Sequence, residues 1–505
     1  MAPWNWFQQL IKMNTTTLKR VELYESETVQ YSKGWMYLVL SACPNLETFH
    51  CVGYNDSTNG SVLIPTSSAL LVDHQFPASL TLPLARISAT SPSIARCIPE
   101  ILPHCPYLEE ISFDDYKITS GDDINEERLL CQILTAIDQH CPIIKKVDIN
   151  PRSSSSIRKN GHPTIISAAK SGLQSLSFHL FNEHNIDNKC DQALTSFIKQ
   201  HHTTLVKLSI SMVHNGWNAY FSNGSSRPMQ YLERLSELDI PKMRDLTISQ
   251  HCHISRTIFY YDINRVVHHI IQRCHSLEYL QLINCFDAKV LQSVADHLDR
   301  QRLRTIRLAK HAWDQCEQHE SSEKQYRDMA IDSLCRTFNH TMILTIIDLD
   351  IGAWVDDRVL RAIGHNDKHR HALTRLRIGK DNEITSKGVL DFANDMQQSQ
   401  LTHLSIHLCY DNAIDDILEL STLPYLVNIE IVANCDYPVA RNSLCRFFTT
   451  TPNTTRLRIS YAYHDGSSRK EPHQVYTCSG MDGSTYLIDL KHGAHKTRIH
   501  FMNED

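Results

Sequence analysis

The stretch Cys274-His275-Ser276-Leu277-Glu278-Tyr279-Leu280-Gln281-Leu282-Ile283-Asn284-Cys285 is the clearest copy of a unit that recurs along the chain. It follows the pattern Leu-x-x-Leu-x-Leu-x-x-Cys, and the apolar run Val266-Val267-His268-His269-Ile270-Ile271 precedes it. The pattern has the two-residue period of a strand, whereas the preceding run has the period of a helix. Since a single copy cannot bury both apolar faces, the sequence predicts that neighbouring copies stack.

About fifteen copies follow one another at spacings of roughly 25 to 42 residues, which is typical of the longer leucine-rich repeats. Helix-period runs precede them, for example at 94–102, 129–137, 194–198, 291–298 and 329–338. Parallel strands joined by helical crossovers predict an α/β fold, a right-handed solenoid or horseshoe with a concave parallel sheet and convex helices. The apolar sets of the expected strands are Leu18/Val21/Leu23, Leu46/Phe49/Cys51, Leu80/Leu82, Leu108/Ile111/Phe113, Ile144/Val147/Ile149, Leu173/Leu176/Phe178, Leu205/Leu208/Ile210, Leu235/Leu238/Ile240, Leu277/Leu280/Leu282, Leu303/Ile306/Leu308, Leu344/Ile347/Leu349, Leu373/Leu376/Ile378, Leu401/Leu404/Ile406, Leu426/Ile429/Ile431 and Thr454/Leu457/Ile459.

The repeat pattern fades near the carboxyl end of the chain. We therefore expect a solenoid over residues 1–463 and a second segment over 464–505. The second segment begins with a polar linker at 464–470, and two strand-like stretches at 486–490 and 497–501 flank Gly493. These stretches predict a hairpin that covers the open end of the solenoid.

Composition indicates which binding partners and which cellular compartment to expect. The chain has 505 residues, with 50 Lys and Arg against 56 Asp and Glu and a pI near 6.6, so neither nucleic acid nor an anionic membrane is an expected partner. No run reaches the ~18 apolar residues of a membrane helix, and the first residues lack a secretory signal. We expect a cytoplasmic or nuclear protein, in which the 16 cysteines are reduced thiols and several occupy the core.

The cysteines mark a resemblance to a known family. The openings Cys43-Pro44-Asn45-Leu46, Cys105-Pro106-Tyr107-Leu108 and Cys141-Pro142-Ile143-Ile144, with the copy ending at Cys285, resemble the cysteine-containing leucine-rich repeats of F-box proteins. This resemblance covers about residues 1–460. It implies substrate recognition for an SCF-type ubiquitin ligase, whose adaptor and cullin would be partners if an F-box precedes the repeats.

The F-box itself is not found in the sequence. Only a partial first repeat precedes Leu18, which suggests a truncated gene model or a lost domain. The stretch at 98–102, Ile-Pro-Glu-Ile-Leu, is similar to the start of an F-box, but it runs directly into the copy at Leu108 and is assigned to a repeat helix. No adaptor-binding residue is carried over. The alternative is an F-box-free interaction or structural scaffold unrelated to ubiquitination.

A binding surface is expected on the concave face of the sheet. Counting the first Leu of each copy as position one, positions three, five and seven point away from the core. Several of the residues at these positions are charged, and two alternatives remain for them. They form either a self-neutralising polar ladder or a charged-peptide or phosphate site that uses Arg375 and Arg377. Position five is occupied, from the middle of the chain onward, by Asp239, Gln281, Arg307, Asp348, Arg377, Ser405, Glu430 and Arg458.

Insertions directly after strands, at 53–66, 151–163, 212–229 and 310–324, are expected on one rim of the sheet, where such scaffolds carry recognition. We expect a protein-binding rim formed by aromatic residues, with Tyr279, Gln281, Arg375, Arg377, His403 and His407 beneath it. The alternative is that each Trp packs its own loop against the sheet edge. The aromatic residues of the expected rim are Trp217, Tyr220, Trp313 and Trp354.

Chemistry-bearing motifs are absent from the sequence. It contains no phosphate-binding glycine loop, no His-Glu-x-x-His and no Gly-x-Ser-x-Gly. The clusters His251-Cys252-His253 and His365/His369/His371 lack a second pair at zinc-finger spacing. The sequence therefore predicts a non-catalytic protein-binding scaffold with no catalytic residue, metal or cofactor.

Overall fold

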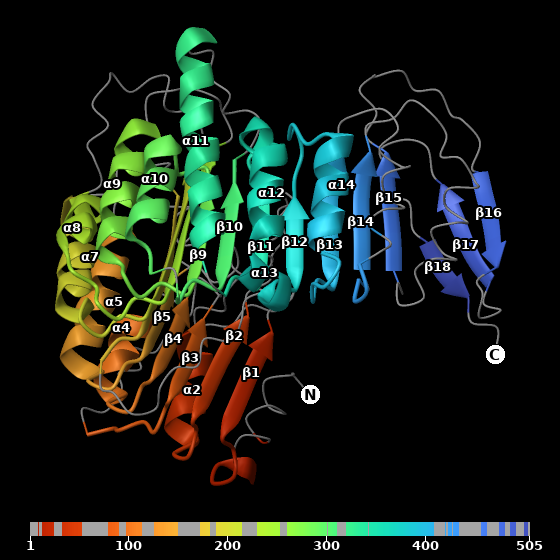
Figure 1. Cartoon of the computed structure of the whole chain (residues 1–505). Coiled ribbons are helices and arrows are strands. Elements are labelled where there is room, and N and C mark those ends of the chain that lie inside the picture. The colour runs from red at the N-terminus through yellow and green to blue at the C-terminus, as the bar shows by residue number, and fades with distance from the viewer. Residues whose placement is uncertain are drawn as a thin grey trace. The chain divides into compact units, whose positions relative to one another are not determined.

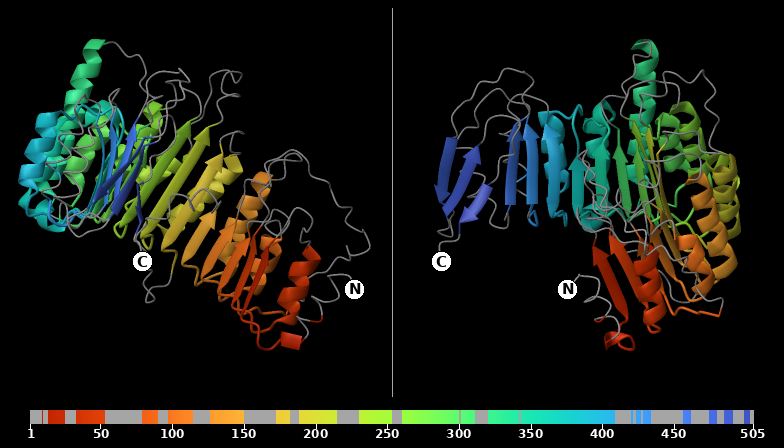
Figure 2. Two further views of the ribbon diagram at one scale, coloured as in Figure 1. Left: turned by 90° about the vertical axis from the view of Figure 1, so that its right-hand side faces the viewer. Right: turned by 180° about the vertical axis from the view of Figure 1, so that it is seen from behind.

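The chain forms two compact units, Met1–Ile254 and Ser255–Asp505, each a parallel sheet with helices on one face (Figures 1 and 2). In each unit the strands follow one another in chain order, so the units have a repeating, solenoid-like α/β architecture. The computed structural model describes residues 9, 13–24, 33–52, 79–89, 97–113, 126–149, 172–181, 188–214, 230–252, 260–299, 301–310, 320–341, 343–408, 420, 423–426, 428–433, 456–461, 474–479, 485–490 and 499–502.

In the first unit each strand pairs in parallel with the next one along the chain. The strands are β1 (Arg20–Tyr24), β2 (Thr48–Val52), β3 (Arg86–Ala89), β4 (Glu110–Phe113), β5 (Lys146–Ile149), β6 (Ser175–Phe181), β7 (Lys207–His214) and β8 (Asp245–Cys252). The helices are α2 (Lys33–Ala42), α4 (Ile98–Ile101), the 3-10 turn η2 (Leu102–His104), α5 (Glu126–His140), α7 (Asn188–His201) and α8 (Gln230–Glu237).

The second unit repeats the same order of elements. Its parallel strands are β9 (Tyr279–Ile283), β10 (Thr305–Ala309), β11 (Ile346–Asp350), β12 (Arg375–Ile378), β13 (His403–Leu408), β14 (Asn428–Ala433) and β15 (Arg456–Tyr461). Its helices are α9 (Tyr260–Arg273), α10 (Ala288–His297), α11 (Glu320–His340), the 3-10 turn η6 (Gly352–Trp354), α12 (Asp357–His365), α13 (Asp367–Ala372) and α14 (Ser386–Asp395).

The core of each repeat lies between the strand and the helices. In β12, Leu376 and Ile378 are buried whereas Arg375 and Arg377 are partly exposed, as the two-residue period requires. Helix α12 is amphipathic in the same sense, because it buries Val359, Leu360 and Ile363. Complete burial of one such aliphatic side chain contributes about 1.5 to 3 kcal/mol. The Leu/Ile/Val anchors of the sequence pattern are thus core residues.

Threonines stabilise the starts of successive strands in the second unit. The hydroxyls of Thr345, Thr374 and Thr402 each donate to a carbonyl oxygen of the preceding repeat, at 3.1, 3.0 and 2.9 Å. The backbone N–H groups of the same threonines donate across the same gap, at 2.7, 2.9 and 3.0 Å. Each step between these repeats is therefore held by paired hydrogen bonds as well as by the strand ladder.

Two expected strands are in the wrong place. The third strand is β3 rather than 79–82, and the eighth is β8 rather than 235–240. In both cases a proline follows the false apolar pattern, Pro83 after Leu82 and Pro241 after Ile240. Proline has no N–H for the ladder and is excluded from central strands. Leu82 and Leu235 are nevertheless core residues, because both are buried although neither lies in a strand.

The carboxyl-terminal segment forms a separate antiparallel sheet of β16 (Gln474–Ser479), β17 (Thr485–Leu490) and β18 (Ile499–Met502). Strands β17 and β18 occupy the two stretches in which a hairpin is expected, and β16 is a third strand that the sequence analysis did not anticipate. The expected linker at 464–470 lies outside the described residues. Whether this sheet covers the open end of the solenoid stays a prediction.

Candidate functional site

The open face of the sheet in the second unit, which carries no described helix of that unit, presents its side chains in straight rows. Strand pairing places Gln281, Arg307, Asp348, Arg377 and Ser405 side by side in that order. The row continues through the register positions of Glu430 and Arg458. This is the expected position-five order, with one correction. Asp239 lies between α8 and β8, because its copy of the pattern is not a strand.

Arg377 at the centre of this face is clamped by two aspartates of the preceding strand. Its Nη1 lies 2.9 Å from Asp348 Oδ1 and its Nη2 lies 3.2 Å from Asp350 Oδ2. Burial disfavours the charge on Arg377, but the two carboxylates outweigh that effect and raise its pKa. The self-neutralising arrangement therefore holds for Arg377. The clamp fixes the guanidinium rather than leaving it available as a mobile cation.

Asp350 also imposes a requirement on the next strand. Gly379 follows β12, and a Cβ atom built there would lie 1.9 Å from Asp350 Oδ1 and 2.8 Å from Asp350 Cα. The N–H of Lys380 donates to the same Oδ1 at 3.3 Å. Only glycine leaves room for the carboxylate at this corner. Sequence analysis missed this contact because nothing in the repeat pattern marks Asp350 or Gly379.

Replacing Gly379 with Ala is therefore expected to destabilise the second unit by about 1 to 3 kcal/mol, the usual cost of overpacking. Urea unfolding of the variant measures the cost. In an Asp350→Ala background the clash with the side chain disappears and only the contact with Cα remains, so the same substitution should cost less. An equal cost in both backgrounds would show that Asp350 does not fill this space.

Tyr279 and Arg307 form a cation–π contact at one side of the open face. The Arg307 guanidinium carbon lies 5.8 Å from the centroid of the Tyr279 ring. The Tyr279 hydroxyl donates to Gln281 Oε1, and Gln281 is only 5 % exposed. Tyr279 thus offers accessible surface on this face, whereas Gln281 chiefly supports Tyr279.

Trp354 lies on the rim where the strands end. Its ring packs edge-on against Phe286, with 6.1 Å between centroids, and Lys310 Nζ lies 4.3 Å from its centroid. These partners follow β9 and β10, so Trp354 reaches across two neighbouring repeats. The other aromatic residues of the expected rim, Trp217, Tyr220 and Trp313, lie outside the described residues, and their grouping with Trp354 stays a prediction.

Arg375 and His403 are register neighbours near the strand starts, and His403 is exposed. Burial, followed by the adjacent Arg375 charge, lowers the pKa of His403. His407 lies two residues further along the strand and is only 6 % exposed. Burial likewise lowers the pKa of His407. Of the two histidines expected on this face, His403 has the more accessible side chain.

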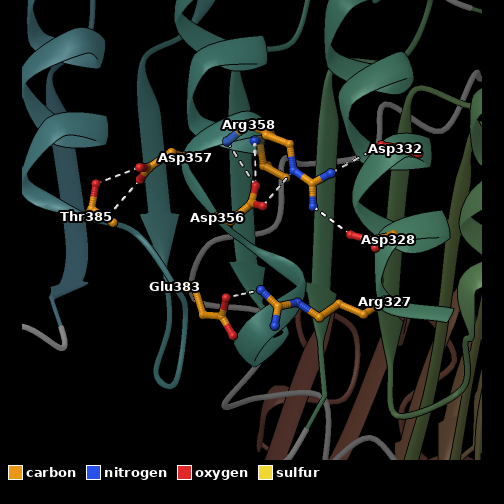
Figure 3. Close-up of polar contacts among 9 residues, drawn as sticks. Arg327, Asp328, Asp332, Asp356, Asp357, Arg358, Glu383 and Thr385 are labelled. Carbon is orange, nitrogen blue, oxygen red and sulfur yellow. Dashed lines mark hydrogen bonds and ion pairs between the residues drawn. The ribbon is translucent and has the colours of Figure 1, made fainter. Parts of the chain in front are cut away.

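A polar network behind the rim holds the helix starts in place (Figure 3). Arg358 of α12 donates to Asp356 at 2.8 Å and to Asp328 of α11 at 3.0 Å. Asp356 also caps α12 by accepting from the N–H groups of Arg358 and Val359. These contacts fix the segment that joins β11 to α12, and with it the position of Trp354.

The same network extends to the next repeat. Asp357 accepts the N–H and hydroxyl of Thr385 at 2.8 and 2.6 Å, and Thr385 caps α14 (Figure 3). Arg327 of α11 pairs with Glu383, and Glu383 forms a backbone bridge with Asp356. Exposed ion pairs contribute only ~0 to 1 kcal/mol each. Their role here is to orient the connections that carry the rim.

The cysteines at the repeat positions lie in the core. Cys43, Cys105, Cys141 and Cys285 are buried, which confirms the expected core thiols. Burial raises the pKa of both Cys141 and Cys285 to about 12, so these thiols are protonated at neutral pH. Among the described residues, no group of three or more His, Cys, Asp or Glu side chains is placed to hold a metal ion.

The described part of the chain also contains no helix long and apolar enough to cross a bilayer. The described fold and open face define a repeat protein of the parallel α/β, solenoid-like class. No protein-family model matches the chain, and no curated protein matches it. Its function has to be inferred from its own residues.

Proposed function

We propose that the chain is a leucine-rich-repeat protein, a right-handed horseshoe, whose function is non-catalytic protein binding through the open face and rim of the second unit. The observation that carries this proposal is a sheet face that no described helix of the unit covers, with Arg377 and Tyr279 on it and Trp354 on its rim, each held by neighbouring side chains. Arg, Tyr and Trp dominate the energetics of protein interfaces, and side chains fixed in advance lose little entropy on binding. Helical crossovers between parallel strands are almost always right-handed, which supports the handedness.

Site-specific photo-crosslinking tests the proposal. A photoreactive residue at Ser405 on the open face is expected to capture a defined set of proteins in cell extract. The same residue at Lys289, on the exposed side of α10, is the control, and it should capture few or none of them. Identical sets from both positions, or no capture at Ser405, would contradict the proposal. Replacing Trp217 and Trp313 together with Ala then asks whether the rim loops contribute to capture.

The narrower role we propose is substrate recognition for an SCF-type ubiquitin ligase. Its support is the resemblance of the cysteine-containing repeats to those of F-box proteins. The competing proposal is a scaffold unrelated to ubiquitination. Affinity purification of the full chain with mass spectrometry separates them. Cullin and adaptor should accompany a ligase receptor, and their absence from complexes that contain other specific partners would leave the scaffold role.

A further inference from the structure

One row of the open face changes from apolar to basic along its length. Its register partners are Tyr279, Thr305, Ile346, Arg375 and His403 in adjacent strands. Tyr279, Ile346 and Arg375 are partly exposed and His403 is exposed, whereas Thr305 is buried. These five positions include no carboxylate. The row therefore offers an apolar surface at one end and positive charge at the other.

Arg375 differs from four other basic residues on described strands, Arg86, Lys146, Lys207 and Arg377, each of which lies close to a carboxylate. In the first unit, Arg86 and Lys146 both lie near Glu110, at 3.5 and 3.9 Å, and Lys207 lies 2.6 Å from Asp245. In the second unit Arg377 has its own pair of aspartates. Arg375 makes no ion pair within the described part of the chain. Within the described residues, no carboxylate is paired with the positive charge of Arg375.

His403 is oriented beside Arg375 by the threonine ladder. The Thr402 hydroxyl donates its only proton to the carbonyl of Thr374, at 2.9 Å, so its oxygen accepts the Nδ1–H of His403, also at 2.9 Å. Burial and, after it, the charge of Arg375 lower the pKa of this imidazole, which favours its neutral form. The basic end thus holds the positive charge of Arg375 and the polar ring of His403.

We propose that this row binds an extended acidic segment of a partner protein, with an Asp or Glu carboxylate on Arg375, an apolar side chain against Tyr279, and the residues between them passing over Ile346. This inference rests on the proposed protein-binding function and adds the chemistry of the ligand. A guanidinium fork matches a carboxylate in charge and shape. A dianionic phosphate is less well matched, because Arg375 is the only cation among the five positions of this row and Asp348 lies in the neighbouring row.

The geometry also sets the spacing within the ligand. Tyr279 and Arg375 are three strand steps apart, which is about 14 Å at ~4.8 Å per step. An extended segment that crosses the strands advances ~3.4 Å per residue. The apolar and acidic residues of the ligand should therefore be about four positions apart.

The probe for the test is a fluorescein-labelled peptide of Ser, Thr and Gly with a single Leu and, four positions later, a single Glu. Fluorescence anisotropy with the full chain measures its Kd. Changing Glu to Gln is expected to weaken binding about tenfold, the typical effect of losing one charge-assisted contact. Moving Glu to two positions after Leu should weaken it similarly. A phosphoserine in place of Glu should bind no more tightly.

Variants of the protein test the position of the contact. Arg375→Gln should weaken the Glu peptide about tenfold and leave the Gln peptide unchanged, whereas Arg375→Lys should lose less. The matched control is Arg361→Gln, because Arg361 lies on α12 and pairs with Asp391 at 3.3 Å. This control variant should bind both peptides as the wild type does.

Several results would overturn the inference. They are equal binding of the Glu and Gln peptides, tighter binding of the phosphoserine peptide, insensitivity to Arg375→Gln, and no anisotropy change up to about 1 mM peptide. The crosslinking experiment separates failure of this inference from failure of the proposed function. Partners captured at Ser405 whose capture does not depend on Arg375 would remove only the acidic-ligand inference.

Discussion

Truncating Leu376 to Ala is expected to lower the free energy of unfolding of the second unit by about 2 to 5 kcal/mol. Leu376 is fully buried at the centre of β12, and its register partners Ile347 and Leu404 are buried as well. Removing three carbon atoms at such a site loses their transfer free energy and leaves a cavity between the strand and the helices. Because stability in a repeat protein is shared between neighbouring repeats, the whole unit should weaken.

The matched control lies one residue away. Arg375→Gln changes the preceding side chain of the same strand, which points to the open face and makes no described ion pair, so its effect should stay within about 0.5 kcal/mol. Urea unfolding followed by peptide-resolved hydrogen–deuterium exchange reports on β12 and its neighbours in both variants. Similar losses for the two substitutions would mean that the core and open faces of β12 are not distinguished as described.

The same alternation explains how much of the fold the sequence could predict. A strand that buries Leu376 and Ile378 must place Arg375 and Arg377 on the other face, so the apolar period alone gave the rows of the open sheet. The period failed where leucines are buried without being in a strand, as with Leu82 and Leu235. There the proline immediately after the pattern was the better signal, because a proline cannot donate a backbone hydrogen bond to the strand ladder.

The site was less predictable than the fold. The row order predicted that Asp348 meets Arg377, but not that Asp350 supplies the second carboxylate or that Gly379 makes room for it. Trp354 was predicted on the rim, but not its contacts with Phe286 and Lys310. Such contacts involve the segments between strands and helices. These segments differ in length from repeat to repeat, so they show no common sequence period. The contacts depend on the three-dimensional path of each connection, which sequence spacing does not specify.

The histidines at 365, 369 and 371, which the sequence analysis did not assign to a metal site, show the same limit, because their spacing does not indicate that they have different surroundings. His369 is 0 % exposed, and its Nε2 lies 3.0 Å from Thr341 Oγ1 at the end of α11. His365 pairs instead with Asp395, and His371 is exposed. Burial lowers the pKa of His369 to about 4, and the backbone of Ile363 opposes this shift in part. A buried neutral histidine of this kind makes stability depend on pH.

Acidification from pH 7 to pH 4 is therefore expected to cost the second unit about 3 kcal/mol through His369 alone, with about 2 kcal/mol of that lost by pH 5. The folded pKa is below the unfolded value of 6.5, so the unfolded chain binds the proton first. The contribution of the neutral ring is present above pH 6.5 and is lost as the pH falls toward 4. Urea unfolding at each pH measures this loss.

Comparison with His369→Gln isolates this residue from the carboxylates that titrate in the same range. Glutamine can keep a hydrogen bond to Thr341 and does not titrate, so the wild type should lose up to about 1.4 kcal/mol more per pH unit than the variant below pH 6. His371→Gln, on the exposed side of the same short helix, should follow the wild type. If His369→Gln shows the same pH dependence as the wild type, His369 has the same pKa in the folded and unfolded chain, and its burial does not make stability depend on pH.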